Sequence, residues 1–131
     1  MLHPNQFHVN EAWIVFKLND APLATEADGD FNLLALMDAA SCFMLGTTTI
    51  STSSPELSQM EAKRFLKNGQ SHKKQLPMKI FIPDTLLAGQ FATEAQRLKI
   101  GIQRIPETEL NVFIGEARES FKQRFGGGST Q

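Results

Sequence analysis

The apolar and polar positions in the first third of the chain form blocks that are typical of β-strands. Residues 12–18 are an almost unbroken aromatic and β-branched run, which predicts a strand buried on both faces. Residues 43–51 are a plain strand sequence. Residues 31–37 favour strand or helix, because Leu, Met and Ala are good helix formers. A polar turn at residues 38–41 favours the strand, and the three strands are predicted to form a meander whose last two make a hairpin.

Helical spacing appears after residue 53. Ser53 and Glu56 have capping-box spacing, which predicts a helix over residues 55–68 with Gly69 as its left-handed cap. Further along, the pattern predicts a strand at 78–82, a helix at 86–99, a strand at 102–105 and an amphipathic last helix. The apolar positions of that last helix are Leu110, Phe113, Ile114, Ala117 and Phe121.

The composition is that of one ordinary globular domain, with 131 residues, a hydrophobic share of 41% and a charged share of 21%. The single cysteine, Cys42, excludes a disulfide within the chain and a zinc site built from cysteines. Its apolar neighbours predict a buried, inert thiol. Neither a signal peptide nor an apolar stretch of membrane-spanning length stands out, so we expect a cytoplasmic protein without membrane contact.

The net charge of −1 conceals two segments of opposite charge. Residues 1–62 carry one basic residue against eight acidic ones, and residues 63–104 carry nine basic residues against two acidic ones, so their net charges are −7 and +7. We expect these segments to pair within the fold. The alternative is a separate surface for weak polyanion binding or for a homo-oligomer contact. The contact residues would then be Lys63, Lys67, Lys73 and Lys74.

The order of the elements is three strands, a helix, a strand, a helix, a strand and a helix, which resembles the RNase H-like fold. Several short runs resemble the retroviral integrase and transposase catalytic core more specifically. Residues 32–46 are similar to its second and third strands, and residues 80–84 to its fourth strand, which ends in an Asp. Residues 100–102 are similar to the opening of its fifth strand, and Trp13 stands where the family often has a Trp.

This resemblance covers residues 12–125 and implies an α/β domain with a mixed five-stranded sheet. Strand 12–18 should be central, with the hairpin on one side and the two later strands on the other. We expect residues 1–11 to be an N-terminal extension and residues 126–131 to be a flexible tail.

The family cuts nucleic acid with carboxylates that hold two divalent ions. One of these acids matches Asp84, at the end of the fourth strand. The acid of the first strand should fall at Phe16, and a phenyl ring cannot ligate magnesium. The acid of the last helix falls at Gly115 or Glu116, and Asp20 is a substitute from the end of the first strand.

Structural roles compete for Asp84 and Glu116, and Asp38 has a structural role of its own. Asp84 follows a strand, and we expect it to cap the next helix. Asp38 is expected to shape the hairpin turn. Glu116, on the polar side of an amphipathic helix, is expected to be a solvated charge.

We therefore predict a non-catalytic, integrase-core-like domain that has lost its metal site, needs no cofactor and acts as a protein or nucleic-acid interaction module. The alternative is a nuclease or DNA strand-transferase that depends on Mg²⁺ or Mn²⁺ and uses Asp84 with Glu116 and Asp20. A third alternative is a small regulatory protein of another α/β fold, in which residues 31–41 are helical.

Overall fold

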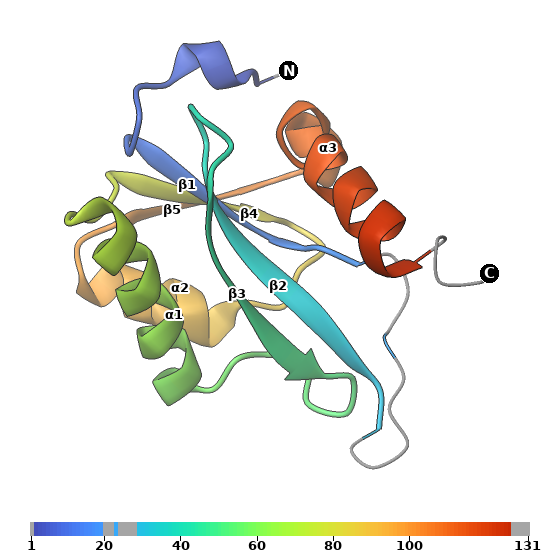
Figure 1. Ribbon diagram of the computed structural model, residues 1–131. Helices are drawn as coiled ribbons and strands as arrows, with labels where there is room; N and C mark the ends of the chain where they lie inside the picture. Colours follow the sequence, from blue (N-terminus) through green and yellow to red (C-terminus); the bar gives the residue numbers. More distant parts are fainter. Residues whose placement is uncertain (1, 20–22, 24–28, 127–131) are drawn as a thin grey trace.

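The computed structural model describes residues 2–19, 23 and 29–126 of the chain (Figure 1). The predicted substitute acid Asp20 and the tail beyond Gly126 lie outside these residues.

A mixed five-stranded sheet in the order β3-β2-β1-β4-β5 forms the centre of the protein. The strands are β1 (Ala12–Lys17), β2 (Phe31–Asp38), β3 (Met44–Ser51), β4 (Lys79–Pro83) and β5 (Gly101–Ile105). β2 pairs antiparallel with β1 and β3, whereas β4 pairs parallel with β1 and β5. The predicted position of strand 12–18 at the centre of the sheet is thereby confirmed.

β2 is a strand despite its helix-forming residues. Its buried side chains alternate between the two faces of the sheet, with Leu34 and Leu36 on one face and Ala35 and Met37 on the other. Burial on both faces and pairing with two neighbouring strands outweigh local helix propensity. The alternative with a helix at residues 31–41 is therefore wrong.

Helices cover both faces of the sheet (Figure 1). α1 (Gln59–Lys73) and α2 (Gly89–Arg97) lie on the face to which β1 contributes Trp13 and Val15. α3 (Asn111–Phe121) lies on the opposite face, over Ile14 and Phe16.

Short irregular turns flank α3. The 3₁₀ turn Glu107–Leu110 precedes α3, and the π-helical turn Lys122–Gly126 continues it. Leu110, Phe113 and Ile114 are buried and Ala117 and Phe121 are partly buried, which confirms the predicted apolar face of the last helix.

The predicted bounds of α1 are wrong at both ends. The helix begins at Gln59, and Ser58 and Glu61 form its capping box, whereas the prediction used Ser53 and Glu56. It also continues through Gly69 to Lys73, and its C-cap residue Lys74 has the left-handed conformation with a φ of 63°. Gly69 serves close packing instead, since an added Cβ would lie 2.9 Å from both Leu36 Cδ2 and Trp13 Cζ3.

Glu56 caps a different helix from the one predicted. Its carboxylate accepts a 2.5 Å hydrogen bond from the backbone N–H of Gln90, in the first turn of α2. Asp84 does not cap α2, because the helix begins at Gly89 and its N-cap residue is Ala88. The prediction of a cap at Asp84 is therefore wrong.

The N-terminal segment packs against the domain on the α3 face. A 3₁₀ turn at Pro4–Gln6 leads to Phe7, whose ring centroid lies 5.6 Å from that of Phe81 and 6.1 Å from that of Phe113. Leu2 packs against the same cluster. The segment thus covers the part of the face next to the start of α3.

Buried Asp38 links this segment to the β2–β3 turn. Its carboxylate accepts hydrogen bonds from the backbone N–H of Asn10 at 2.6 Å and from the backbone N–H and hydroxyl of Ser41 at 2.9 and 2.8 Å. Asn10 in turn accepts a hydrogen bond from Trp13 Nε1 at 2.7 Å. Asp38 is therefore the turn residue that the sequence predicts.

None of the helices in the described ranges has both the length and the apolar character needed to cross a membrane.

Candidate functional site

The first candidate site is the carboxyl end of the central strands. Because β1 and β4 are parallel neighbours, side chains at their carboxyl ends meet at the same end of the sheet. In the integrase-like interpretation, this end should carry the acids of the first and fourth strands. Phe16 is fully buried there under α3, and Asp84 is exposed just after β4.

A guanidinium group occupies the position above Phe16. Arg118, in the last turn of α3, has its guanidinium carbon 5.9 Å from the centre of the Phe16 ring. Its Nε–H donates a 2.9 Å hydrogen bond to the backbone carbonyl of Lys17, the last residue of β1. Its Nη1 pairs with the carboxylate of Glu107. Three contacts therefore hold this cation at the end of β1.

A second guanidinium group lies beside Asp84. Arg104 on β5 donates a 3.2 Å hydrogen bond from Nη1 to the backbone carbonyl of Pro83. The backbone N–H of Asp84 donates to Ile105, so this residue is tied to the edge strand through its main chain.

Glu116, the third predicted acid, is exposed on α3 and lies beside the β2–β3 turn. Its negative charge is one of the causes that raise the pKa of the Cys42 thiol. Gly115, the other position considered for this acid, has no side chain to offer as a ligand. Among the described residues, no group of three or more His, Cys, Asp or Glu side chains could hold a metal ion.

These residues do not fit the two-metal centre that the resemblance implies. A phenyl ring stands at the position of the first acid, and a paired guanidinium lies above the ring. Divalent ions need several oxygen ligands, and a fixed positive charge opposes their binding.

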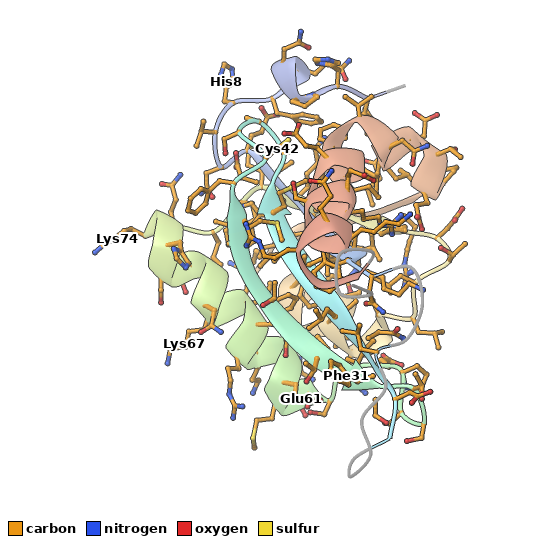
Figure 2. The ribbon with its side chains drawn as sticks, turned by 45° about the vertical axis from the view of Figure 1, so that its right-hand side comes forward. His8, Phe31, Cys42, Glu61, Lys67 and Lys74 are labelled. Atoms are coloured by element: carbon orange, nitrogen blue, oxygen red, sulfur yellow. The ribbon has the colours of Figure 1, made fainter. Side chains whose placement is uncertain are left out.

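The second candidate site is the outer surface of α1. Lys63, Lys67 and Lys74 are exposed, and Lys67 and Lys74 point away from the body of the protein (Figure 2). Lys73 is the last residue of the helix. α1 thus brings together in space the basic residues that the sequence places close together.

The expected pairing between the acidic and basic segments does not appear among the ion pairs of the described residues. One of these pairs joins Glu94 to Arg97 at 3.0 Å within α2, and the other joins Glu107 to Arg118. Neither connects residues 1–62 with residues 63–104. Lys63, Lys67 and Lys74 thus have no ion-pair partner among the residues that the structure describes.

The third candidate site is an apolar groove of about 1030 Å³ between α3 and the β2–β3 hairpin. Leu33, Met37 and Met44 from the hairpin line it, together with Phe113 and Phe121 from α3. Sequence reasoning missed this groove, because these apolar lining residues have the spacing of ordinary core residues. Only the position of α3 across the sheet shows that the described residues leave part of this face uncovered.

Cys42 lies at the end of the groove, in the turn between β2 and β3, with a φ of 58°. It is half-buried, whereas the sequence predicts a buried thiol. Burial raises the pKa of the thiol, and the negative charges of Asp38 and Glu116 raise it further.

Two solved structures resemble this arrangement. A chain of the simian T-cell lymphotropic virus intasome, in complex with PP2A regulatory subunit B56 gamma, superposes with a TM-score of 0.58 and 15% sequence identity over 88% of this chain. This chain spans 39% of the length of that one. The HTLV-2 integrase catalytic core domain, in complex with magnesium and in a dimeric form, gives a TM-score of 0.51 and 12% identity. Coverage in that case is 87% of this chain and 86% of the integrase domain.

The protein therefore has the RNase H-like fold of the integrase catalytic core type, as the sequence predicts. At these identities the likeness establishes the fold alone. No protein-family model matches the chain, and no match was found among curated proteins.

Proposed function

We propose that this domain is a non-catalytic relative of the integrase core that acts through contacts with nucleic acid or protein. The observation that carries the proposal is the position of Arg118 over Phe16. In a metal-dependent nuclease of this fold, the acid of the first strand binds cations at the carboxyl end of that strand. Here a cation from the protein itself lies at that end and is hydrogen-bonded to the strand.

The ion pair with Glu107 strengthens this interpretation. Arg118 is partly buried, with 20% of its side chain exposed, so its charge is less screened than that of a surface residue. A divalent ion would have to displace the guanidinium and leave Glu107 without its partner. Among the described acids of the alternative, Asp84 and Glu116 offer too few oxygen ligands to offset that cost.

The test of the non-catalytic proposal is a cleavage assay on DNA and RNA with Mg²⁺ or Mn²⁺. The matched control is Asp84→Asn, which keeps the shape of an exposed side chain and removes its charge. We expect no cleavage by the wild-type protein above that of the variant. Metal-dependent cleavage that is abolished by Asp84→Asn would establish the nuclease alternative instead.

The contact surface in this proposal is the basic outer face of α1. Lys63, Lys67 and Lys74 extend from one side of the helix, and its first turn carries one acid, Glu61. Clustered exposed lysines bind polyanions by releasing counterions, so such binding weakens steeply with salt. The neighbouring structure in complex with a phosphatase regulatory subunit makes a protein partner the other candidate for this surface.

Binding to a mixed-sequence DNA duplex from low to moderate salt tests this surface. We expect Lys67→Glu and Lys74→Glu to weaken binding at low salt and to flatten its salt dependence. Lys122→Glu, an equal charge change on the π-helical turn beyond α3, should have a smaller effect. Equal losses for all three variants would show a general charge effect and contradict a surface on α1.

A further inference from the structure

The groove between α3 and the hairpin is elongated, and its two ends differ. One end lies at Cys42 in the β2–β3 turn and the other at Phe31, at the start of β2 (Figure 2). Phe113 and Phe121 on α3 are eight residues apart, which corresponds to about 12 Å along a helix. A volume of about 1030 Å³ is at the upper end of the range of roughly 300–1,000 Å³ for small-molecule sites.

Most of the side chains along the groove are apolar. Those in contact with its interior include Leu18, Leu33, Met37, Met44, Phe113 and Phe121. Sites for small molecules typically combine such a lining with a few polar groups that fix the orientation of the ligand. The two methionines add a lining that can adapt its shape to a flexible ligand.

Two charged residues mark the groove and have opposite signs. Arg124, on the π-helical turn beyond α3, lines the groove eight residues further along the chain than Glu116, and its exposed side chain has no partner among the described residues. Glu116 lies toward the Cys42 end, where its charge acts on the thiol. An anionic group would be attracted to the Arg124 end and repelled from the Glu116 end.

We infer that this groove binds an elongated aliphatic molecule with a carboxylate head group, with the head at Arg124 and the chain along α3 toward Cys42. The apolar lining supplies affinity in proportion to chain length, and the two charges fix the direction. This inference is independent of the proposed loss of metal chemistry, since Arg118, Phe16 and Asp84 take no part in it.

Chain length and charge give two separate expectations. Each added methylene should strengthen binding roughly fourfold until the groove is filled, because burying a CH₂ group contributes about 0.8 kcal/mol. Removing the head-group charge, by comparing dodecan-1-ol with dodecanoate, should weaken binding by roughly threefold at low salt. The charge effect is small because Arg124 is exposed.

The test is calorimetric titration of the full chain with octanoate, decanoate and dodecanoate below their micelle concentrations. Thr47→Trp should abolish binding, because Thr47 is exposed on β3 and lines the groove. Thr49→Trp is the matched control, since Thr49 is exposed two residues further along β3 and does not line the groove. Arg124→Gln should weaken binding roughly threefold, and its exposed neighbour Lys122→Gln should leave binding unchanged.

Cys42 supplies a second readout that needs no substitution. Saturating dodecanoate should slow modification of the thiol by a disulfide reagent at least severalfold, and octanoate at the same concentration should slow it less. This measurement remains valid if Thr47→Trp does not fold. The inference is overturned if no saturable one-to-one binding is found or if binding does not increase with chain length. It is also overturned if dodecan-1-ol binds as tightly as dodecanoate, or if Thr49→Trp blocks binding as effectively as Thr47→Trp.

Discussion

The two faces of the sheet are covered to different extents. On one face, α1 and α2 pack side by side and enclose a cluster that includes Trp13, Phe65 and Phe91. On the other face, α3 and the N-terminal segment together cover the sheet in part. Among the described residues, the hairpin side of that face remains an open groove. We refer below to the closed face and the open face.

The difference shows how one sheet can serve both stability and binding. Both faces use apolar residues of the same kinds, because β1 and β2 contribute alternate side chains to each. The number of covering helices decides whether those residues are sealed from water. On the open face Ile14, Phe16 and Met37 are fully buried as well, but Leu33, Met44 and Phe121 remain partly accessible. A contiguous accessible apolar surface is typical of binding sites.

Truncating a large aromatic residue should have the largest effect, and it should differ between the faces. Phe65→Ala, on the closed face, removes a side chain that is 1% exposed, and should lower the free energy of unfolding by about 3–5 kcal/mol. Phe121→Ala, on the open face, removes a partly buried ring, and should cost roughly 1–2 kcal/mol. Urea unfolding measures both, and equal losses would show that the groove is closed in solution.

Adding a methyl group to a helical glycine should have opposite effects on the two faces. Gly69→Ala in α1 places a Cβ 2.9 Å from buried atoms of Leu36 and Trp13, so we expect a loss of about 1–3 kcal/mol. Gly115→Ala in α3 meets nothing within 4 Å and should gain about 0.5–1 kcal/mol from helix propensity. Thermal unfolding of the two variants would reveal the signs, and a stabilising Gly69→Ala would contradict the close packing of α1.

The reactivity of Cys42 should show the smallest effect and reports on the open face alone. Burial, Asp38 and Glu116 raise the pKa of the thiol, so less of the reactive thiolate is present at a given pH. The rate of modification should therefore rise with pH through a midpoint above that of a free cysteine. Glu116→Gln should lower this midpoint slightly, whereas Glu119→Gln, an exposed control on the same helix, should leave it unchanged.

If Cys42 showed the midpoint of a free cysteine, the turn would be more open than the structure has it. If Glu119→Gln lowered the midpoint as much as Glu116→Gln, the position of Glu116 at the groove would be wrong.

The sequence determined the order of the elements and most of the sheet. The aromatic and β-branched run of β1, the plain strand pattern of β3 and the helical spacing of α3 are local signals, because each follows from the period of one element. Their order was enough to identify the RNase H-like arrangement. The presence of Phe16 where the resemblance implies the first-strand acid was also visible, since residue type alone decides whether a side chain can ligate a metal.

The tertiary structure decided what depends on contacts between elements. Two pairs of residues have capping-box spacing, Ser53 with Glu56 and Ser58 with Glu61. The second pair caps α1, whereas Glu56 of the first pair caps α2. Glycine is a residue type common at helix ends, yet Gly69 lies inside α1. A glycine is needed there because Trp13 and Leu36 leave no room for a Cβ.

The two features that support the functional proposals also come from tertiary structure. Arg118 reaches the carbonyl of Lys17, a residue 101 positions away, and no local pattern encodes such a contact. The groove exists because α3 crosses only part of its face of the sheet. Local periodicity predicts that a residue is apolar and faces the core, but the packing of distant elements determines whether anything covers it.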